Sequence, residues 1–154
     1  FNIEYENHFN ISRTDLLAQY HACDMLVLAS IYEGFGLPII EANAVGRPVV
    51  TSNCWSMPEV ARNAACIVDP FDSLSIRQGI DRLIKDADYR EHLVKQGYEN
   101  VKRFHLDNIA CQYAALYREK MGILRFKKIH VHNDSYSRGY TTIGYLPEIQ
   151  RGGS

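Results

Sequence analysis

Short runs of mainly apolar residues alternate with longer amphipathic stretches over most of the chain. The short runs predict strands at residues 25–28, 48–51 and 65–68, and those at 25–28 and 65–68 are typical of buried strands, the first covered on both faces. Apolar residues at helical spacing predict helices at 14–22, 38–45, 56–62, 73–85, 88–104 and 106–121. Strands and helices that alternate in this way indicate an α/β fold with a parallel sheet and right-handed crossovers.

The character of the sequence changes after Ile123. Residues 126–132 predict a further strand, whereas residues 133–144 are rich in Ser, Tyr, Thr and Gly and predict a loop. Neither segment has an obvious place in the preceding sheet. We therefore expect a globular domain at residues 1–121 and an extension at 122–154, for which the pattern leaves open an irregular tail or the start of another domain.

The composition is typical of a soluble globular domain, with 154 residues of which 46% are hydrophobic and 23% charged. A net charge of −1 supplies no basic field for nucleic acid, so any bound phosphate must be held locally. No apolar run approaches the roughly 20 residues of a membrane-spanning helix. The four cysteines are far apart in the sequence, which favours buried thiols in a reducing compartment over a zinc site or a redox dithiol.

The first residue is Phe1 rather than Met, and it falls within what the pattern indicates is a polar strand or loop. We therefore expect the chain to be a fragment whose natural N-terminus lies upstream.

The stretch from Glu33 to Glu41 carries the candidate chemistry. It consists of Glu-Gly-Phe-Gly-Leu-Pro-Ile-Ile-Glu and connects the strand at 25–28 to the following helix. Ligands of open parallel sheets bind at the carboxyl ends of the strands, where this loop is expected. Gly34 and Gly36 allow the backbone to approach a ligand closely, and the N–H groups and dipole at the helix start favour a phosphate. The stretch therefore predicts a phosphate site, which suits the pyrophosphate of a nucleotide sugar.

Two carboxylates flank this predicted site. The glycines and Pro38 keep Glu33 in the loop, whereas Glu41 falls about one turn inside the helix, where the dipole favours its ionised form. Carboxylates accept paired hydrogen bonds from vicinal hydroxyls, so one can hold a ribose and the other the transferred sugar. Taken alone, the pattern also fits a solvated helix residue and a glutamate before a turn, because a lone Gly-x-Gly is a weak signal.

A longer set of motifs points to a family. It consists of Ser-Ile-Tyr-Glu-Gly-Phe-Gly-Leu-Pro-Ile-Ile-Glu-Ala at 30–42, Gly-Arg-Pro-Val-Val-Thr-Ser-Asn at 46–53, Pro-Glu-Val at 58–60 and Val-Asp-Pro at 68–70. These motifs resemble those of the group 1 (family 4) glycosyltransferases, and the resemblance extends from about residue 14 to residue 120. It implies a GT-B enzyme, in which two Rossmann-like domains face each other across a cleft. This chain then corresponds to the C-terminal, donor-binding half, truncated at its N-terminus.

The resemblance implies a retaining transferase that moves a sugar from a nucleotide-sugar donor to a glycan or lipid-linked acceptor, with no metal or other cofactor. Glu33 matches the family's catalytic contact to the donor sugar, and Glu41 matches its contact to the ribose. We expect the ring of Phe35 to pack against the fold. The donor-binding loop, in which backbone amides meet the phosphates, matches Gly34, Phe35, Gly36 and Leu37.

The resemblance also implies that parts of the enzyme lie upstream of this chain. The family's Arg and Lys that neutralise the diphosphate, and the whole acceptor-binding domain, precede the matched region, so we expect no sugar transfer by this chain alone. The intact enzyme is expected in the cytoplasm or at the inner face of the membrane, without a nucleic-acid partner. Two other classes stay open, namely a non-catalytic nucleotide-binding or scaffold module derived from such a transferase and an NAD-dependent oxidoreductase. Titration with uridine or guanosine diphosphate and with NAD separates them.

Histidines and one aromatic residue outside the central motif carry weaker signals. His21 and His105 fall on helical patterns, where packing or surface roles are favoured over catalysis. His130 and His132 share a face of one predicted strand, which gives two metal ligands without a third. Trp55 follows the second strand, so that it either borders the donor base or anchors its loop.

Overall fold

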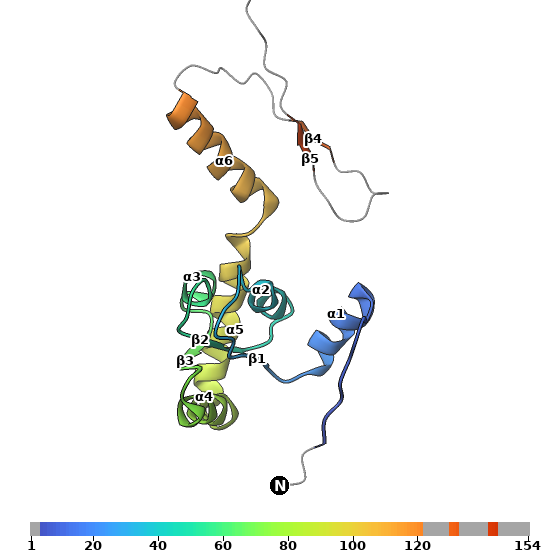
Figure 1. The fold of residues 1–154 in the computed structure, drawn as a ribbon, viewed down its shortest axis with the longest axis vertical. Coiled ribbons are helices and arrows are strands. Elements are labelled where there is room, and N and C mark those ends of the chain that lie inside the picture. Colours follow the sequence, from blue (N-terminus) through green and yellow to red (C-terminus); the bar gives the residue numbers. More distant parts are fainter. Residues whose placement is uncertain (1–3, 122–129, 133–141, 145–154) are drawn as a thin grey trace, which may run out of the picture. The chain divides into compact units, whose positions relative to one another are not determined.

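A three-stranded parallel sheet organises the first part of the molecule (Figure 1). The computed structural model describes residues 4–121, 130–132 and 142–144, which divide into two units, Phe1–Asn108 and Ile109–Ser154. Both strand pairs are parallel, and the order across the sheet is β1-β2-β3, so the predicted α/β fold is confirmed. The strands are β1 (Leu26–Leu28), β2 (Val49–Ser52) and β3 (Cys66–Val68).

The helices begin and end within two residues of the predicted segments. They are α1 (Arg13–Ala22), α2 (Leu37–Ala44), α3 (Met57–Ala61), α4 (Ser73–Lys85), α5 (Ala87–Lys102) and α6 (Leu106–Met121). Side chains before three of them accept hydrogen bonds from N–H groups of the first turn, which stabilises each helix start. These capping residues are Ser12 for α1, Asp72 for α4 and Asp86 for α5.

The core lies on both faces of the central strand β2, which is buried along its whole length. On one face, Ile39 of α2 and Met57 of α3 pack in one cluster with Val49. On the other face, Leu83 of α4 packs in one cluster with Val50. Figure 1 shows α2 and α3 on one side of the strands and α4 on the other, which is the three-layer arrangement of a Rossmann-like fold.

The edge strands differ from the prediction of full burial. Val27 in β1 and Ile67 in β3 are exposed, although their neighbours in the same strands are buried or half-buried. In the described part of the chain β1 and β3 form the two edges of the sheet, so the helices cover its centre more completely than its margins. The prediction that β1 is covered on both faces is therefore wrong at Val27.

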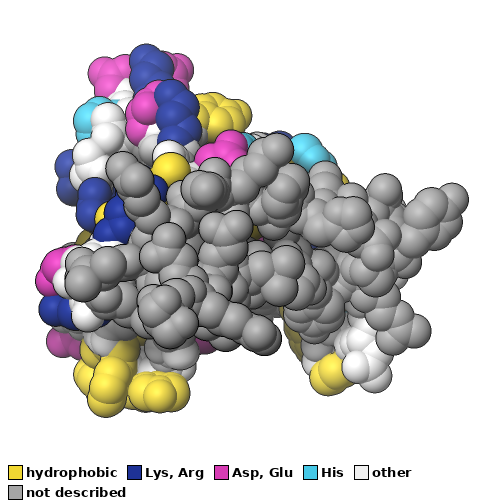
Figure 2. Space-filling model, turned by 90° about the horizontal axis from the view of Figure 1, so that it is seen from above, with side chains coloured by type: hydrophobic (Ala, Val, Ile, Leu, Met, Phe, Trp, Pro, Cys, Tyr) yellow, Lys and Arg dark blue, Asp and Glu magenta, His cyan; other side chains and the backbone are white. Residues whose placement is uncertain are grey.

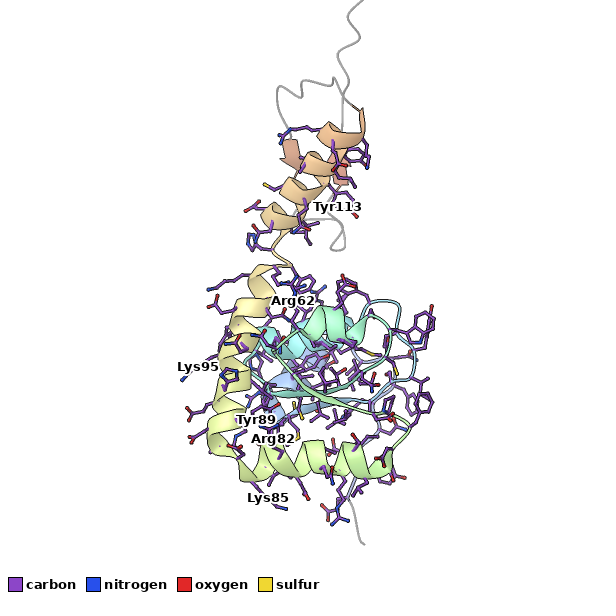
Figure 3. The ribbon with its side chains drawn as sticks, turned by 90° about the vertical axis from the view of Figure 1, so that its left-hand side faces the viewer. Arg62, Arg82, Lys85, Tyr89, Lys95 and Tyr113 are labelled. Atoms are coloured by element: carbon purple, nitrogen blue, oxygen red, sulfur yellow. The ribbon has the colours of Figure 1, made fainter. Side chains whose placement is uncertain are left out.

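Contacts at two positions, Tyr89 and Asn100, fix the long helix α5 against its neighbours. The guanidinium of Arg82 in α4 lies 3.5 Å from the ring centre of Tyr89 in α5, and Figure 3 shows the two side chains together where these helices meet. Burial raises the pKa of the Tyr89 phenol.

The buried amide of Asn100, also in α5, donates hydrogen bonds to Asn43 of α2 and to the carbonyl of Val60 in α3, each at 3.0 Å. Because each amide group is satisfied, this network fixes α2 without the cost of an unpaired buried polar group.

In the second unit, β4 (His130–His132) pairs antiparallel with β5 (Thr142–Gly144). The predicted strand at 126–132 is therefore confirmed at 130–132, and its first four positions lie outside the described residues. The predicted loop at 133–144 is wrong at 142–144, where β5 forms, and residues 133–141 also lie outside the described residues. Thr142 and Ile143 are β-branched, which favours an extended backbone over the loop that the neighbouring glycines indicated.

The cysteines and the surface charges qualify the composition-based expectations. Cys66 is buried, Cys23 and Cys54 are half-buried and Cys111 is exposed, so the prediction of buried thiols holds only in part. Lys and Arg side chains lie among Asp and Glu side chains on the described part of the face in Figure 2. Among the described helices, none combines the length and the apolar composition needed to cross a membrane.

Candidate functional site

The loop between β1 and α2 lies at the carboxyl edge of the sheet. Gly36 occupies the N-cap of α2 with φ of +94°, a conformation that favours glycine. A Cβ at Gly36 would lie 3.2 Å from the Cδ1 of Ile39, whereas a Cβ at Gly34 would meet no atom within 4 Å. No side chain caps the start of α2, where Pro38 has no N–H and the N–H of Ile39 donates to the carbonyl of Gly36 at 3.0 Å. The N–H of Leu37, the first residue of the helix, can therefore donate to an anion. Backbone geometry thus favours glycine at position 36. Gly34 is instead surrounded by open space, which a ligand can occupy.

Hydroxyl groups of β2 and of the turn that follows it hold this loop in place. They donate to carbonyl groups of β1 and its loop, and both strand residues are fully buried. The pairs are Thr51 to Leu28 (3.0 Å), Ser52 to Ser30 (2.7 Å) and Ser56 to Glu33 (3.0 Å). The end of β1 and the loop that carries Glu33 are thus tied to β2 and to the turn after it at three successive points.

Glu33 lies in this loop, as predicted, and is half-buried. Its Oε1 accepts a hydrogen bond of 3.0 Å from the hydroxyl of Ser30. Among the described residues, none donates a hydrogen bond to the other carboxylate oxygen, Oε2. One oxygen of Glu33 is therefore oriented by the protein, and the other can accept a hydrogen bond from a ligand.

Glu41 lies one turn inside α2, also as predicted, and its carboxylate is reached from α1. The hydroxyl of Tyr20 donates to Oε2 of Glu41 at 3.0 Å. Burial, followed by the hydrogen bond and the negative charge of Glu41, raises the pKa of the Tyr20 phenol well above its usual value. The guanidinium of Arg47 donates to the carbonyls of Tyr20 (3.1 Å) and His21 (2.9 Å), which fixes the end of α1 beside α2. A pocket of about 220 Å³ that includes Tyr20, Glu41 and Arg13 lies between the two helices.

Aromatic rings surround the loop. Phe35 packs edge-on against Phe104 with ring centres 5.8 Å apart, and Arg103 lies over the other ring at 4.9 Å. Tyr32 and Trp55 form a second edge-to-face pair, with centres 4.9 Å apart and planes at 77°. Trp55 has φ of +50°, the left-handed region that bulky side chains rarely adopt. The Phe35 ring thus packs against Phe104 although 45% of Phe35 is exposed, while Tyr32 and Trp55 extend from the sheet edge.

The histidines lie outside this group of residues. His21 and His105 are exposed, and His105 is 3.4 Å from the carboxylate of Asp107. His130 and His132 belong to β4, in the other unit. Across residues 4–121, 130–132 and 142–144, no three His, Cys, Asp or Glu side chains are grouped to hold a metal ion.

The sequence patterns did not identify several side chains that orient the two glutamates. The patterns give no site role to Tyr20, Ser30 or Ser56. Tyr20 precedes Glu41 by 21 residues, so no local spacing connects them. Ser30 is the first residue of the motif at 30–42, and Ser56 follows the end of β2 by four residues. Hydroxyl residues are common in loops, so neither position indicated a role for its side chain.

A larger pocket, of about 800 Å³, lies at the opposite edge of the sheet. Its lining includes Met25 and Pro48, which precede β1 and β2, together with residues of α4 and α5. It is therefore separate from the carboxyl-edge loop that carries the glutamates.

Comparisons with known proteins agree on one family. Residues 4–100 match the model of the glycosyl transferases group 1 family. The chain is similar to O-antigen chain mannosyltransferase B of Escherichia coli, with 39% identity over 104 residues, which cover 68% of this chain and 27% of that protein. The chain therefore spans little more than a quarter of that relative's length.

Solved structures show the same fold. Sucrose-phosphate synthase from Thermosynechococcus elongatus superposes with a TM-score of 0.62 and 32% identity, over 73% of this chain and 29% of that chain. The C-terminal domain of a glycosyl transferase group 1 family protein from Francisella tularensis gives a TM-score of 0.56 and 32% identity, over 62% of this chain and 50% of that chain.

Proposed function

Because the chain belongs to the glycosyl transferases group 1 family, we propose that it is the donor-binding half of a retaining glycosyltransferase. In this proposal the chain binds a nucleotide-sugar donor, and a second domain positions the acceptor. The E. coli relative is named a mannosyltransferase, and the Francisella structure is named a C-terminal domain, which supports the assignment to the C-terminal half.

The arrangement of Glu33 and Glu41 carries the proposal. Each carboxylate is half-buried and accepts one hydrogen bond from a protein hydroxyl, from Ser30 and Tyr20 respectively. A carboxylate fixed in this way can still accept hydrogen bonds from ligand hydroxyls, and sugars present such hydroxyls in pairs. We assign Glu33, in the loop, to the transferred sugar and Glu41, on the helix, to the ribose.

The diphosphate that joins these two sugars would lie at the start of α2. Gly34 leaves open space there, the helix start has no side-chain cap, and the helix dipole favours an anion. The amides of Phe35, Gly36 and Leu37 are the proposed donors. No metal is part of this proposal, because the amides and the basic groups expected in the rest of the enzyme would balance the charge.

The transfer step follows from this arrangement. The bond between the sugar's anomeric carbon and the diphosphate oxygen breaks, and the acceptor hydroxyl forms a new bond to the same carbon from the same face. The hydroxyl proton goes to a donor phosphate oxygen, so no covalent enzyme intermediate is required. Amides that face the departing diphosphate would stabilise the negative charge that develops on it. In this proposal the second domain positions the acceptor hydroxyl, so we expect no transfer by this chain alone.

Calorimetric titration of the chain with UDP, GDP and NAD tests the proposal. We expect one of the two nucleoside diphosphates to bind, with an affinity that is unchanged in EDTA, and NAD not to bind. Binding of NAD alone would assign the fold to an oxidoreductase instead. Loss of nucleotide binding in EDTA would contradict the metal-free site.

A further inference from the structure

Each of the three strands is followed by an exposed aromatic side chain at the carboxyl edge of the sheet. Tyr32, Trp55 and Phe71 stand three or four residues after the ends of β1, β2 and β3, and we call this set the aromatic rim. Their side chains are 66%, 71% and 72% exposed. Isolated exposed aromatic residues are ordinary on protein surfaces, but a row of them along one edge is characteristic of a binding surface.

Hydrogen bonds hold the turns that present the rim. Ser56, next to Trp55, donates to the carbonyl of Glu33, next to Tyr32, at 3.0 Å. The N–H of Phe71 donates to the carboxylate of Asp69 at 2.9 Å. The backbone of Trp55 has a φ of +50°, in the left-handed region, although the residue is exposed and no burial of its ring requires this conformation. The rings are thus presented by ordered turns rather than by free loops.

The position of the rim favours a sugar over a nucleobase. Tyr32 adjoins Glu33 in the sequence, and Ser56, next to Trp55, donates to the backbone carbonyl of Glu33, so both rings extend from the turns that carry and hold the glutamate that we assign to sugar. Glu41, assigned to the ribose that carries the base, is instead reached by Tyr20 from α1. The two rings meet at 77°, whereas a base held between aromatic side chains requires nearly parallel faces.

We propose that the aromatic rim is a stacking site for the pyranose rings of a glycan. The C–H groups on one face of a pyranose carry partial positive charge, which the negative face of an aromatic ring attracts. With strands roughly 4.8 Å apart, the ends of β1 and β3 that precede the rim are about 10 Å apart, which is longer than one sugar ring. This length favours a glycan chain over a single donor sugar. The inference deepens the proposed function and rests on its assignment of Glu33.

Trp55 is the only tryptophan of the chain, so its fluorescence reports directly on the rim. We expect a mannose trisaccharide to change the Trp55 emission of the full chain in the absence of nucleotide. A change that requires a nucleotide sugar, and is produced neither by the trisaccharide nor by the matching nucleotide, would overturn the glycan site and assign the rim to the donor sugar instead. The same change with nucleoside diphosphate alone would overturn the proposal in favour of base stacking.

Variants separate stacking from folding. Trp55→Ala should weaken saccharide binding in calorimetry about threefold to tenfold, while Trp55→Phe retains most of it. Tyr5→Ala is the matched control, since Tyr5 is 85% exposed and precedes α1. Circular dichroism establishes that each variant is folded.

The proposed function and the rim can fail separately. An unchanged Trp55 emission with saccharides and with a nucleotide sugar that calorimetry shows to bind would overturn the rim and leave donor binding intact. Saccharide binding without binding of any nucleotide would contradict the donor site and support the rim.

Discussion

The hydroxyl of Tyr20 donates a hydrogen bond of 3.0 Å to the carboxylate of Glu41. The two residues are on different helices, and Arg47 fixes the end of α1 through the carbonyl of Tyr20 itself. The carboxylate that we assign to the ribose is thus oriented by a helix that lies before the whole Glu33 to Glu41 stretch in the sequence. Tyr20 is therefore a positioning residue in the proposed donor site.

Replacing Tyr20 with Phe should weaken binding of the nucleoside diphosphate by about fivefold, because the Glu41 carboxylate loses the hydrogen bond that orients it and about 1 kcal/mol of that loss falls on ligand binding. The loss should disappear when the ligand is the 2′,3′-dideoxy nucleotide, which has no ribose hydroxyls for Glu41 to bind. Calorimetry with both ligands measures this difference. An equal loss with the dideoxy ligand would indicate a general structural role for Tyr20.

The raised pKa of Tyr20 predicts a dependence of stability on alkaline pH. Burial and the nearby Glu41 carboxylate keep the phenol protonated in the folded chain. Above about pH 10, the unfolded state has released a proton that the folded state retains. The free energy of unfolding should therefore fall as the pH rises above this value, and this contribution is fully present below it.

Urea unfolding between about pH 8 and pH 11 measures this slope. Tyr20→Phe should reduce the slope without abolishing it, because the pKa of Tyr89 is also raised, chiefly by burial. Tyr113→Phe, which replaces an exposed phenol, is the control. An unchanged slope in Tyr20→Phe would contradict the assigned cause.

Gly34 and Gly36 should respond differently to substitution by alanine. Gly36→Ala should destabilise the chain by about 1 to 2 kcal/mol, because φ is +94° there and the added Cβ would lie 3.2 Å from Ile39. Gly34→Ala should leave the stability within about 0.5 kcal/mol, since open space surrounds that position. Its new methyl group should nevertheless weaken nucleotide binding, because the ligand is expected to occupy that space. Urea unfolding and calorimetry on both variants check this, and unchanged nucleotide affinity in Gly34→Ala would exclude close approach of the phosphate there.

Local patterns predicted the order of the strands and helices in the first unit and the positions of Glu33 and Glu41. Hydrophobic spacing acts within a few residues, so one sequence window contains it. The contact of Tyr20 with Glu41 and the exposure of Val27 depend instead on which elements become neighbours. Local spacing does not encode that information, so the sequence patterns identified the two carboxylates but not the hydroxyls that orient them.

The central claim assigns Glu33 to the transferred sugar and Glu41 to the ribose. Substitution of each by Gln keeps the size of the side chain and removes its charge. A hydrogen bond to a charged group contributes roughly 1.5 to 3 kcal/mol, so each loss should be on the order of tenfold to a hundredfold in the affinity of the ligand concerned. Glu91→Gln, in an exposed glutamate of α5, should change neither affinity.

The most direct test is calorimetric titration of these variants with a nucleoside diphosphate and with the corresponding nucleotide sugar. Glu41→Gln should weaken binding of both ligands, because both contain the ribose. Glu33→Gln should weaken binding of the nucleotide sugar alone and leave the affinity for the nucleoside diphosphate nearly unchanged. If Glu33→Gln abolishes binding of the nucleoside diphosphate while Glu41→Gln leaves both affinities intact, the assignment is wrong.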